Sequence, residues 1–303
     1  MVFRKSVVAA MLAFCAAGFV MSTTALKAAD FTAEQIAEGQ KFIVNNALFI
    51  LFHESGHMLV SELGLPVLGR EEDAVDGLSG VMLLESVEDE FKAAMQDAAD
   101  GWFLIDEAKG EGPQESDFID THGLDRQRAY SLVCMMSGAD PDYFKTFIDS
   151  IQFPAERREE CGGEYAKIRD SWFGLLEQHQ DEQKTSKFTV TYEPANNADL
   201  QPFADLLQEA QVLEAIEATY GEGYDIPDGI KVTGKTCGTE NAFWHEGSRE
   251  ITYCYEMAAY HAALMVNYFT NLNAPADPSV EQAEAPTPEA EANANSVKLK
   301  LKD

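Results

Sequence analysis

Residues 36–63 read IAEGQKFIVNNALFILFHESGHMLVSEL, and this stretch decides the fold of the 303-residue chain. Its apolar side chains recur at helical spacing until Gly64 and Pro66 end the pattern. Just upstream, Thr32 and Gln35 have the three-residue spacing of a capping box. The sequence therefore predicts one long helix that begins near Thr32, with a break at Asn45-Asn46 as the alternative.

This helix carries an H-E-x-x-H motif, His53-Glu54-Ser55-Gly56-His57. Residues four apart lie on one helix face, so the two imidazoles stand one turn apart and can bind a single zinc ion. Glu54 lies about a quarter-turn away, where it can accept a proton from a zinc-activated water as general base. The acid between the histidines makes a purely structural histidine pair the weaker interpretation.

A run of carboxylates, Glu71-Glu72-Asp73-Ala74-Val75-Asp76, follows after a short turn that would fold the next helix back against the first. Catalytic zinc needs a third protein ligand, and Glu72 is the candidate for it. Asp76, one turn later, is the candidate acceptor for a histidine N–H behind the metal. Glu71, Asp73 and Asp76 remain rival third ligands.

The two motifs together resemble the gluzincin metallopeptidases, whose thermolysin-like members carry H-E-x-x-H followed by E-x-x-x-D on the next helix. The resemblance covers these two helices, and it departs in the spacer from His57 to Glu72, which is shorter here. The metzincin pattern does not fit, because Val60 and Leu63 occupy positions that prepare its third histidine.

Three further phrases extend the resemblance over nearly the whole mature domain. They are residues 65–73 (LPVLGREED), residues 122–128 (HGLDRQR), and Cys237-Gly238 followed by NAF at 241–243 and CYE at 254–256. The chain is similar in these phrases to a family of bacterial predicted metallopeptidases known only as a domain of unknown function. The resemblance implies a zinc-peptidase-like fold and names no substrate.

The rest of the chain predicts helices first and strands later. From residue 187 onward the hydrophobic period changes from helical to alternating. We expect an α+β, mainly helical, zincin-like fold whose small antiparallel sheet comes after the H-E-x-x-H helix, a permuted order, with one hairpin arm as the edge strand that binds peptide. The expected helices are 71–105, 125–136, 141–151, 155–178, 200–220 and 256–270, and the expected strands are 188–192, 230–236 and the hairpin arms 241–244 and 250–255.

The two ends of the chain have compositions unlike the middle. Arg4 and Lys5 precede an apolar run of signal-peptide length, which predicts export to the periplasm or secretion. The C-terminal end is rich in Ala, Pro and Glu and predicts disorder. The expected division is a signal peptide at 1–29, a peptidase domain at 30–272 with a metal-binding helical part at 30–186 and a sheet-containing part at 187–272, and a disordered acidic tail at 273–303.

Four cysteines remain after removal of the signal peptide: Cys134, Cys161, Cys237 and Cys254. An even number in an exported chain favours disulfides. Three pairings are possible, and closeness in sequence favours Cys134 with Cys161 and Cys237 with Cys254. The absence of a C-x-x-C spacing argues against a cysteine-ligated zinc.

The composition limits the partners. With 52 acidic and 22 basic residues the formal charge is -30, which disfavours nucleic-acid and anionic membrane partners. We therefore expect a peptide or protein substrate, no nucleic acid, and no stable membrane insertion after signal cleavage. The sequence does not specify an oligomeric state.

These observations predict an exported zinc-dependent metallopeptidase. His53, His57 and Glu72 would hold Zn2+, Glu54 would act as general base, and His122 is a second catalytic candidate as a hydrogen-bond donor to the transition state. The alternatives are a non-catalytic exported protein that binds zinc or peptide, and a zinc hydrolase of a non-peptide substrate.

Overall fold

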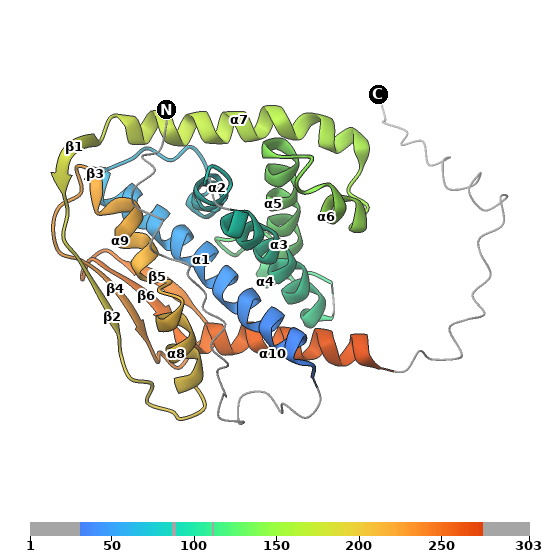
Figure 1. Ribbon diagram of the computed structural model, residues 1–303. Coiled ribbons are helices and arrows are strands. Elements are labelled where there is room, and N and C mark those ends of the chain that lie inside the picture. The colour runs from blue at the N-terminus through green and yellow to red at the C-terminus, as the bar shows by residue number, and fades with distance from the viewer. Residues whose placement is uncertain (1–30, 87–88, 111, 275–303) are drawn as a thin grey trace.

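The computed structural model describes residues 31–86, 89–110 and 112–274. The expected signal peptide and all but the first two residues of the expected tail lie outside this range. A helical body surrounds one central helix, and a small sheet packs on one side of it (Figure 1). Within the described residues, no helix has both the length and the apolar character that a bilayer span requires.

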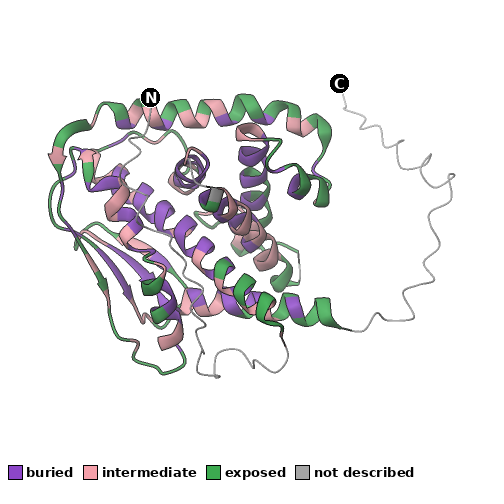
Figure 2. Ribbon diagram, viewed as in Figure 1, coloured by how far each residue is buried: buried purple, intermediate pink, exposed green. Residues whose placement is uncertain are grey.

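The central helix is α1 (Ala33–Leu63), and it is continuous over its whole length. Thr32 and Gln35 form the predicted capping box, and Gly64 ends the helix with a left-handed φ of 61°. Most of α1 is buried from Phe42 to Leu59, as the purple ribbon in Figure 2 shows. It is buried because α2, α3, α10 and the sheet all pack against it, so the H-E-x-x-H motif lies inside the protein body.

The other helices follow the predicted order, except that two expected helices are divided and the short helix at residues 115–118 was not predicted. The expected helix 71–105 is two helices, and the expected helix 200–220 is interrupted where Gln211 adopts a φ of 52°. The apolar spacing in the sequence continues across both breaks, so it did not reveal that each expected helix is divided. The helices are α2 (Glu71–Leu84), α3 (Asp89–Lys109), α4 (Glu115–Phe118), α5 (Asp125–Ala139), α6 (Lys145–Ser150), α7 (Ala155–Glu177), α8 (Gln201–Glu209), α9 (Glu214–Tyr220) and α10 (Tyr255–Asn273).

The main sheet has four strands in the order β2-β4-β6-β5: β2 (Phe188–Tyr192), β4 (Ile230–Lys235), β6 (Glu250–Cys254) and β5 (Ala242–His245). The predicted α+β, mainly helical class is confirmed, and all four strands follow α1 in the chain. The expectation of an antiparallel sheet is wrong, because β2 with β4 and β4 with β6 pair in parallel and only β5 with β6 is antiparallel.

Long connections explain the parallel pairs. The segment between β2 and β4 contains α8 and α9, and such a crossover returns the chain in the same direction. The predicted hairpin places β6 between β4 and β5, so β5 becomes an edge strand. A separate ribbon of β1 (Gln180–Thr185) and β3 (Glu222–Tyr224) was not predicted, since β1 is polar throughout and lacks alternation.

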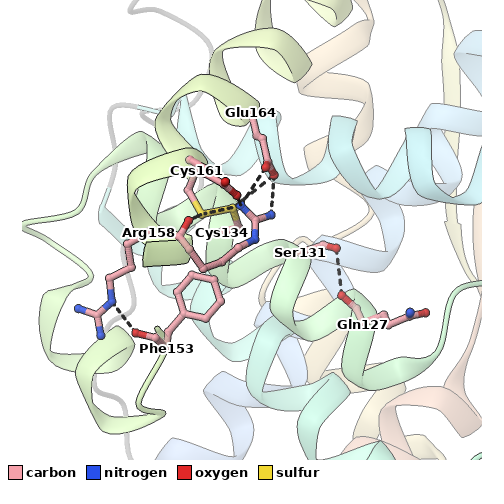
Figure 3. The surroundings of a disulfide bond; sticks show 9 residues. Gln127, Ser131, Cys134, Phe153, Arg158, Cys161 and Glu164 are labelled. Carbon is pink, nitrogen blue, oxygen red and sulfur yellow. Dashed lines mark hydrogen bonds and ion pairs between the residues drawn. A yellow bond between two sulfur atoms is a disulfide. The ribbon is translucent and has the colours of Figure 1, made fainter. Parts of the chain in front are cut away.

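Both expected disulfides are present. Cys134 and Cys161 join α5 to α7, with Glu164 nearby (Figure 3). Arg157 donates hydrogen bonds to Glu164 next to this disulfide. Cys237 and Cys254 join the loop after β4 to the end of β6. The favoured pairing is therefore confirmed, and the second disulfide anchors the base of the hairpin that carries the edge strand.

Gly56 allows α1 and α2 to approach closely, because a Cβ at this position would lie 2.6 Å from Cβ of Val75. We expect Gly56→Ala to destabilise the protein by about 1–3 kcal/mol through overpacking, measured by urea unfolding. Gly174→Ala on α7 is the matched control, since nothing lies within 4 Å of that position, and it should be neutral or stabilising by up to about 1 kcal/mol. Equal stability of the two variants would contradict this account of the helix crossing.

Candidate metal centre

Three predicted site residues converge on one point between α1 and α2. The Nε2 atoms of His53 and His57 lie 3.3 Å apart. Oε2 of Glu72, from the first turn of α2, lies 3.1 Å from Nε2 of His53 and 3.3 Å from Nε2 of His57. Helical spacing aligns the two imidazoles, and the turn after Gly64 brings the carboxylate to them.

This donor set fits a zinc ion. Tetrahedral zinc with bonds of about 2.0–2.1 Å to nitrogen and oxygen places neighbouring ligand atoms about 3.3 Å apart. The three distances among His53, His57 and Glu72 are 3.1–3.3 Å. Two imidazoles and one carboxylate also match the ligand types of catalytic zinc sites, in which the fourth position is left for solvent or substrate.

His122 reaches the same carboxylate from the loop before α5. Its Nε2 lies 3.1 Å from Oε2 of Glu72, and its Nδ1 lies 3.0 Å from Oδ1 of Asp120. The ligand atoms of His53, Glu72 and His122 all lie within 4.8 Å of one another. The structure therefore places His122 at the edge of the centre, where it could contact a bound substrate or the metal.

Asp76 lies behind His53. Nδ1 of His53 is 2.7 Å from Oδ1 of Asp76, and this carboxylate accepts two hydrogen bonds of 2.8 Å from Arg128. The Arg128 guanidinium in turn lies 3.6 Å from the ring centre of Trp102. Nδ1–H of His53 donates to Asp76, and this contact orients the imidazole with Nε2 directed into the centre. In the neutral imidazole Nε2 then carries the lone pair that a metal ion would need.

The remaining two acids of the cluster have other partners. Oε1 of Glu71 lies 2.7 Å from Nδ1 of His57, so Glu71 orients the second imidazole as Asp76 orients the first. Asp73 is exposed and pairs with Arg70, whose guanidinium also donates to the backbone oxygen of His122. Of the four acids, Glu72 alone contacts Nε2 of both motif histidines in the described structure.

Glu54 points toward the sheet rather than into the ligand cluster. Its side chain is buried and accepts a hydrogen bond from the backbone N–H of Trp244 in β5. Burial raises the pKa of the Glu54 carboxyl, although His53, His57 and this hydrogen bond oppose the shift. A carboxylate with a raised pKa beside a metal centre is suited to accept and return a proton near neutral pH.

The ionisable groups of the centre shift one another's pKa values. Burial alone would lower the pKa of His53, but hydrogen bonds to Asp76 and Glu72 raise it to about 9. Burial would raise the pKa of Glu72, but hydrogen bonds from His122, His53 and His57 hold it far below its usual range. Each carboxylate thus stabilises positive charge at the point where the nitrogen atoms meet, which is the electrostatic environment that a bound cation needs.

The sequence analysis did not identify three interactions of the centre. These are the contact of Glu71 with His57, the hydrogen bonds from Arg128 to Asp76, and the hydrogen bond from the Trp244 backbone to Glu54. Arg128 and Trp244 lie far from their partners along the chain, and no local spacing signals such pairs. A second group, formed by Cys237, Cys254 and Glu256, also has metal-ligand spacing. Its two sulfur atoms are joined in a disulfide, so they cannot act as thiolate ligands.

Comparison with known proteins identifies the family of the chain. No curated protein and no solved structure matches the chain. One family model matches residues 8–176 and 192–287, which is most of the chain and includes every residue of the centre. The match confirms the resemblance to a metallopeptidase family of unknown function. The chain therefore belongs to the DUF4344 family, which is described as "Putative metallopeptidase".

Proposed function

We propose that the protein is an exported zinc-dependent peptidase. The observation that carries the proposal is the convergence of His53, His57 and Glu72 at zinc-ligand distances, with the buried carboxylate of Glu54 between them and an edge strand. Membership of the metallopeptidase family supports the same reaction class.

A zinc ion held by His53, His57 and Glu72 would supply a Lewis acid that polarises the scissile carbonyl and lowers the pKa of a water. Asp76 and Glu71 hold the two imidazoles with Nε2 directed inward. Burial would raise the pKa of Asp76, but the charge of Arg128 and the hydrogen bonds from His53 and Arg128 hold it well below its usual value. Asp76 therefore stays ionised. These residues keep the ligand set in place before substrate binds.

Glu54 performs the proton transfers. As the water oxygen forms a bond to the carbonyl carbon, Glu54 accepts the water proton. When the C–N bond breaks, Glu54 returns that proton to the departing amine nitrogen. The overall reaction consumes one water and leaves a carboxylic acid and an amine, which exchange a proton to give carboxylate and ammonium. The hydrogen bond from Trp244 holds the carboxylate in position for both steps.

His122 is proposed as the residue that stabilises the developing oxyanion. Its Nε2 already faces a carboxylate oxygen at 3.1 Å, and the hydrogen bond to Glu72 raises its pKa above the usual histidine value. A histidine in the protonated form donates from both nitrogens, so it can bind negative charge that appears on the substrate.

The substrate would lie along β5. Because the backbone N–H of Cys254 donates to the oxygen of Asn241, the alternation of an antiparallel pair directs the backbone groups of Ala242 and Trp244 away from β6. These groups lie at the sheet edge beside α1. An extended peptide that pairs with Ala242 would pass directly next to Glu54, which favours peptides over compact substrates.

Export and the division of the chain remain part of the proposal. Two disulfides favour an oxidising compartment, such as the periplasm or the exterior of the cell. The proposed signal peptide at 1–29 and tail at 273–303 would flank one peptidase domain, in which the metal centre combines the helical part with the edge strand of the sheet-containing part.

Metal analysis combined with peptide digestion tests this function. We expect one zinc per chain and cleavage of an unstructured peptide library, with cleavage lost on adding a chelator and restored by zinc. Zinc without cleavage would favour the non-catalytic binding protein. Chelator-sensitive hydrolysis of esters or other small substrates without peptide cleavage would favour the non-peptide hydrolase. A protein free of zinc after careful reconstitution would overturn all three.

A further inference from the structure

A cavity lies away from the candidate metal centre, between α1, α3, α5 and α10. Its volume is about 460 Å³, and we call it the acidic pocket. None of the metal-centre residues lines it. Its walls consist of four carboxylates (Glu38, Asp97, Asp100, Glu107), four aromatic rings (Phe42, Phe103, Tyr130, Tyr268), three aliphatic side chains (Leu104, Ile151, Met265) and Arg126.

The negative charge of the acidic pocket is only partly balanced. Arg126 is the one basic residue among the described residues that line it, and its guanidinium pairs with Asp106 at 2.6 Å. Burial raises the pKa of Asp97, although a hydrogen bond from Asn45 and the charge of Lys41 oppose this shift. Burial and then the charge of Asp97 raise the pKa of Asp100 to about 7. A cationic ligand would relieve this repulsion.

The pocket also presents apolar surface. Tyr130 and Tyr268 are among the few large aromatic side chains of the described structure that are more than 40% exposed, and both belong to this pocket. Aromatic faces attract both alkyl chains and ammonium groups. The chemistry of the walls therefore calls for an occupant that alternates positive charge with apolar side chains.

The chain contains such a segment. Residues 297–302 read VKLKLK, so Lys298, Lys300 and Lys302 alternate with Val297, Leu299 and Leu301. In extended backbone this alternation places three ammonium groups on one side and three apolar side chains on the other. Residues 275–297 contain no lysine or arginine, so the positive charge of the tail is concentrated in this short segment.

The place where α10 ends brings this segment within reach of the pocket. Helix α10 ends at Asn273, and Met265 and Tyr268 of the same helix line the acidic pocket. A linker of residues 275–296 has 22 residues, which would span roughly 25 Å as a random coil and more in the extended form that Pro and like charges favour. Tyr268 lies only about 8 Å along the helix axis from the last residue of α10. A flexible linker of this length gives the tethered segment an effective concentration of about millimolar at the pocket.

We propose that residues 297–302 of the chain occupy its own acidic pocket, with the lysines against Asp97, Asp100 and the rim carboxylates and the leucines against the aromatic walls. A second copy of the protein is a weaker occupant, since a formal charge of -30 on each chain opposes association. Once docked, residues 297–302 would contact α3, α5 and α10 together. The inference does not depend on the peptidase proposal, because the two sites share no residue.

Carbodiimide cross-linking of the full-length protein tests the inference, because this reagent joins ammonium and carboxylate groups already in contact. We expect peptide mapping to find Lys298, Lys300 or Lys302 joined to carboxylates of the acidic pocket. In the variant K298E/K300E/K302E these links cannot form. A free peptide with the sequence of residues 294–303, added in excess, should reduce them roughly tenfold. The control is Lys167 on α7, which is exposed and far from the tail in sequence, and its cross-links should not change.

Mixing normal and 15N-labelled protein before cross-linking separates contacts within one chain from contacts between chains. Links confined to single chains support the proposal. Links mainly between labelled and unlabelled chains would overturn it in favour of association between copies. Links spread over exposed carboxylates elsewhere, such as Glu159 and Glu160, would overturn it in favour of a tail that does not dock.

Discussion

Glu54→Gln is expected to reduce peptide hydrolysis by roughly 10²–10⁴-fold while zinc remains bound. The amide has nearly the same shape as the carboxylate but cannot accept the water proton. Glu54 does not contact Nε2 of His53 or His57 in the described structure, and it lies against the backbone of Trp244. The change therefore removes the base and leaves the ligands in place.

The measurement compares kcat and zinc content of the variant and the parent protein on the same peptide. Because Glu54 is buried, a thermal unfolding curve should accompany the kinetics. Glu34→Gln is the matched control, since Glu34 lies in the first turn of the same helix and is exposed. Unchanged kcat in the Glu54 variant would refute the assigned role, whereas loss of zinc would show that Glu54 supports the metal.

Glu72→Gln is expected to have the second largest effect, a loss of zinc affinity greater than the roughly 10–100-fold that an outer hydrogen-bond partner contributes. The substitution replaces the only described carboxylate that contacts Nε2 of both motif histidines with a neutral amide. Peptide hydrolysis should fall with zinc occupancy and recover only in part when zinc is added in excess. Competition with a chelating dye measures the affinity.

A graded series of variants separates the neighbouring acids. Glu71→Gln should lower the zinc affinity by roughly 10–100-fold, because it removes the carboxylate that accepts a hydrogen bond from Nδ1 of His57. Asp73→Asn should have little effect, because Asp73 is exposed and pairs with Arg70. His122→Phe should retain zinc and lower kcat. If Glu71→Gln costs more affinity than Glu72→Gln, or if His122→Phe loses the metal, the ligand set is different from the one proposed.

The family resemblance rested on local phrases and was confirmed over most of the chain. Helix α1 could be predicted because its cap, its apolar spacing and its terminal glycine are all local signals. The sheet was harder. Alternation identified β2, β4 and the hairpin, but strand direction depends on how the long connections return, which no alternation records.

The sequence by itself determined that two imidazoles share one helix face, that an acid lies between them, and that an acidic helix follows closely. These are consequences of 3.6 residues per turn and of chain order. Only the tertiary structure decided which acid meets the imidazoles, which acids stand behind them, and that Trp244 lies next to Glu54. Such pairs depend on the angle at which helices cross and on the position of β6 between β4 and β5. Both are set by the packing of segments that are distant in the sequence.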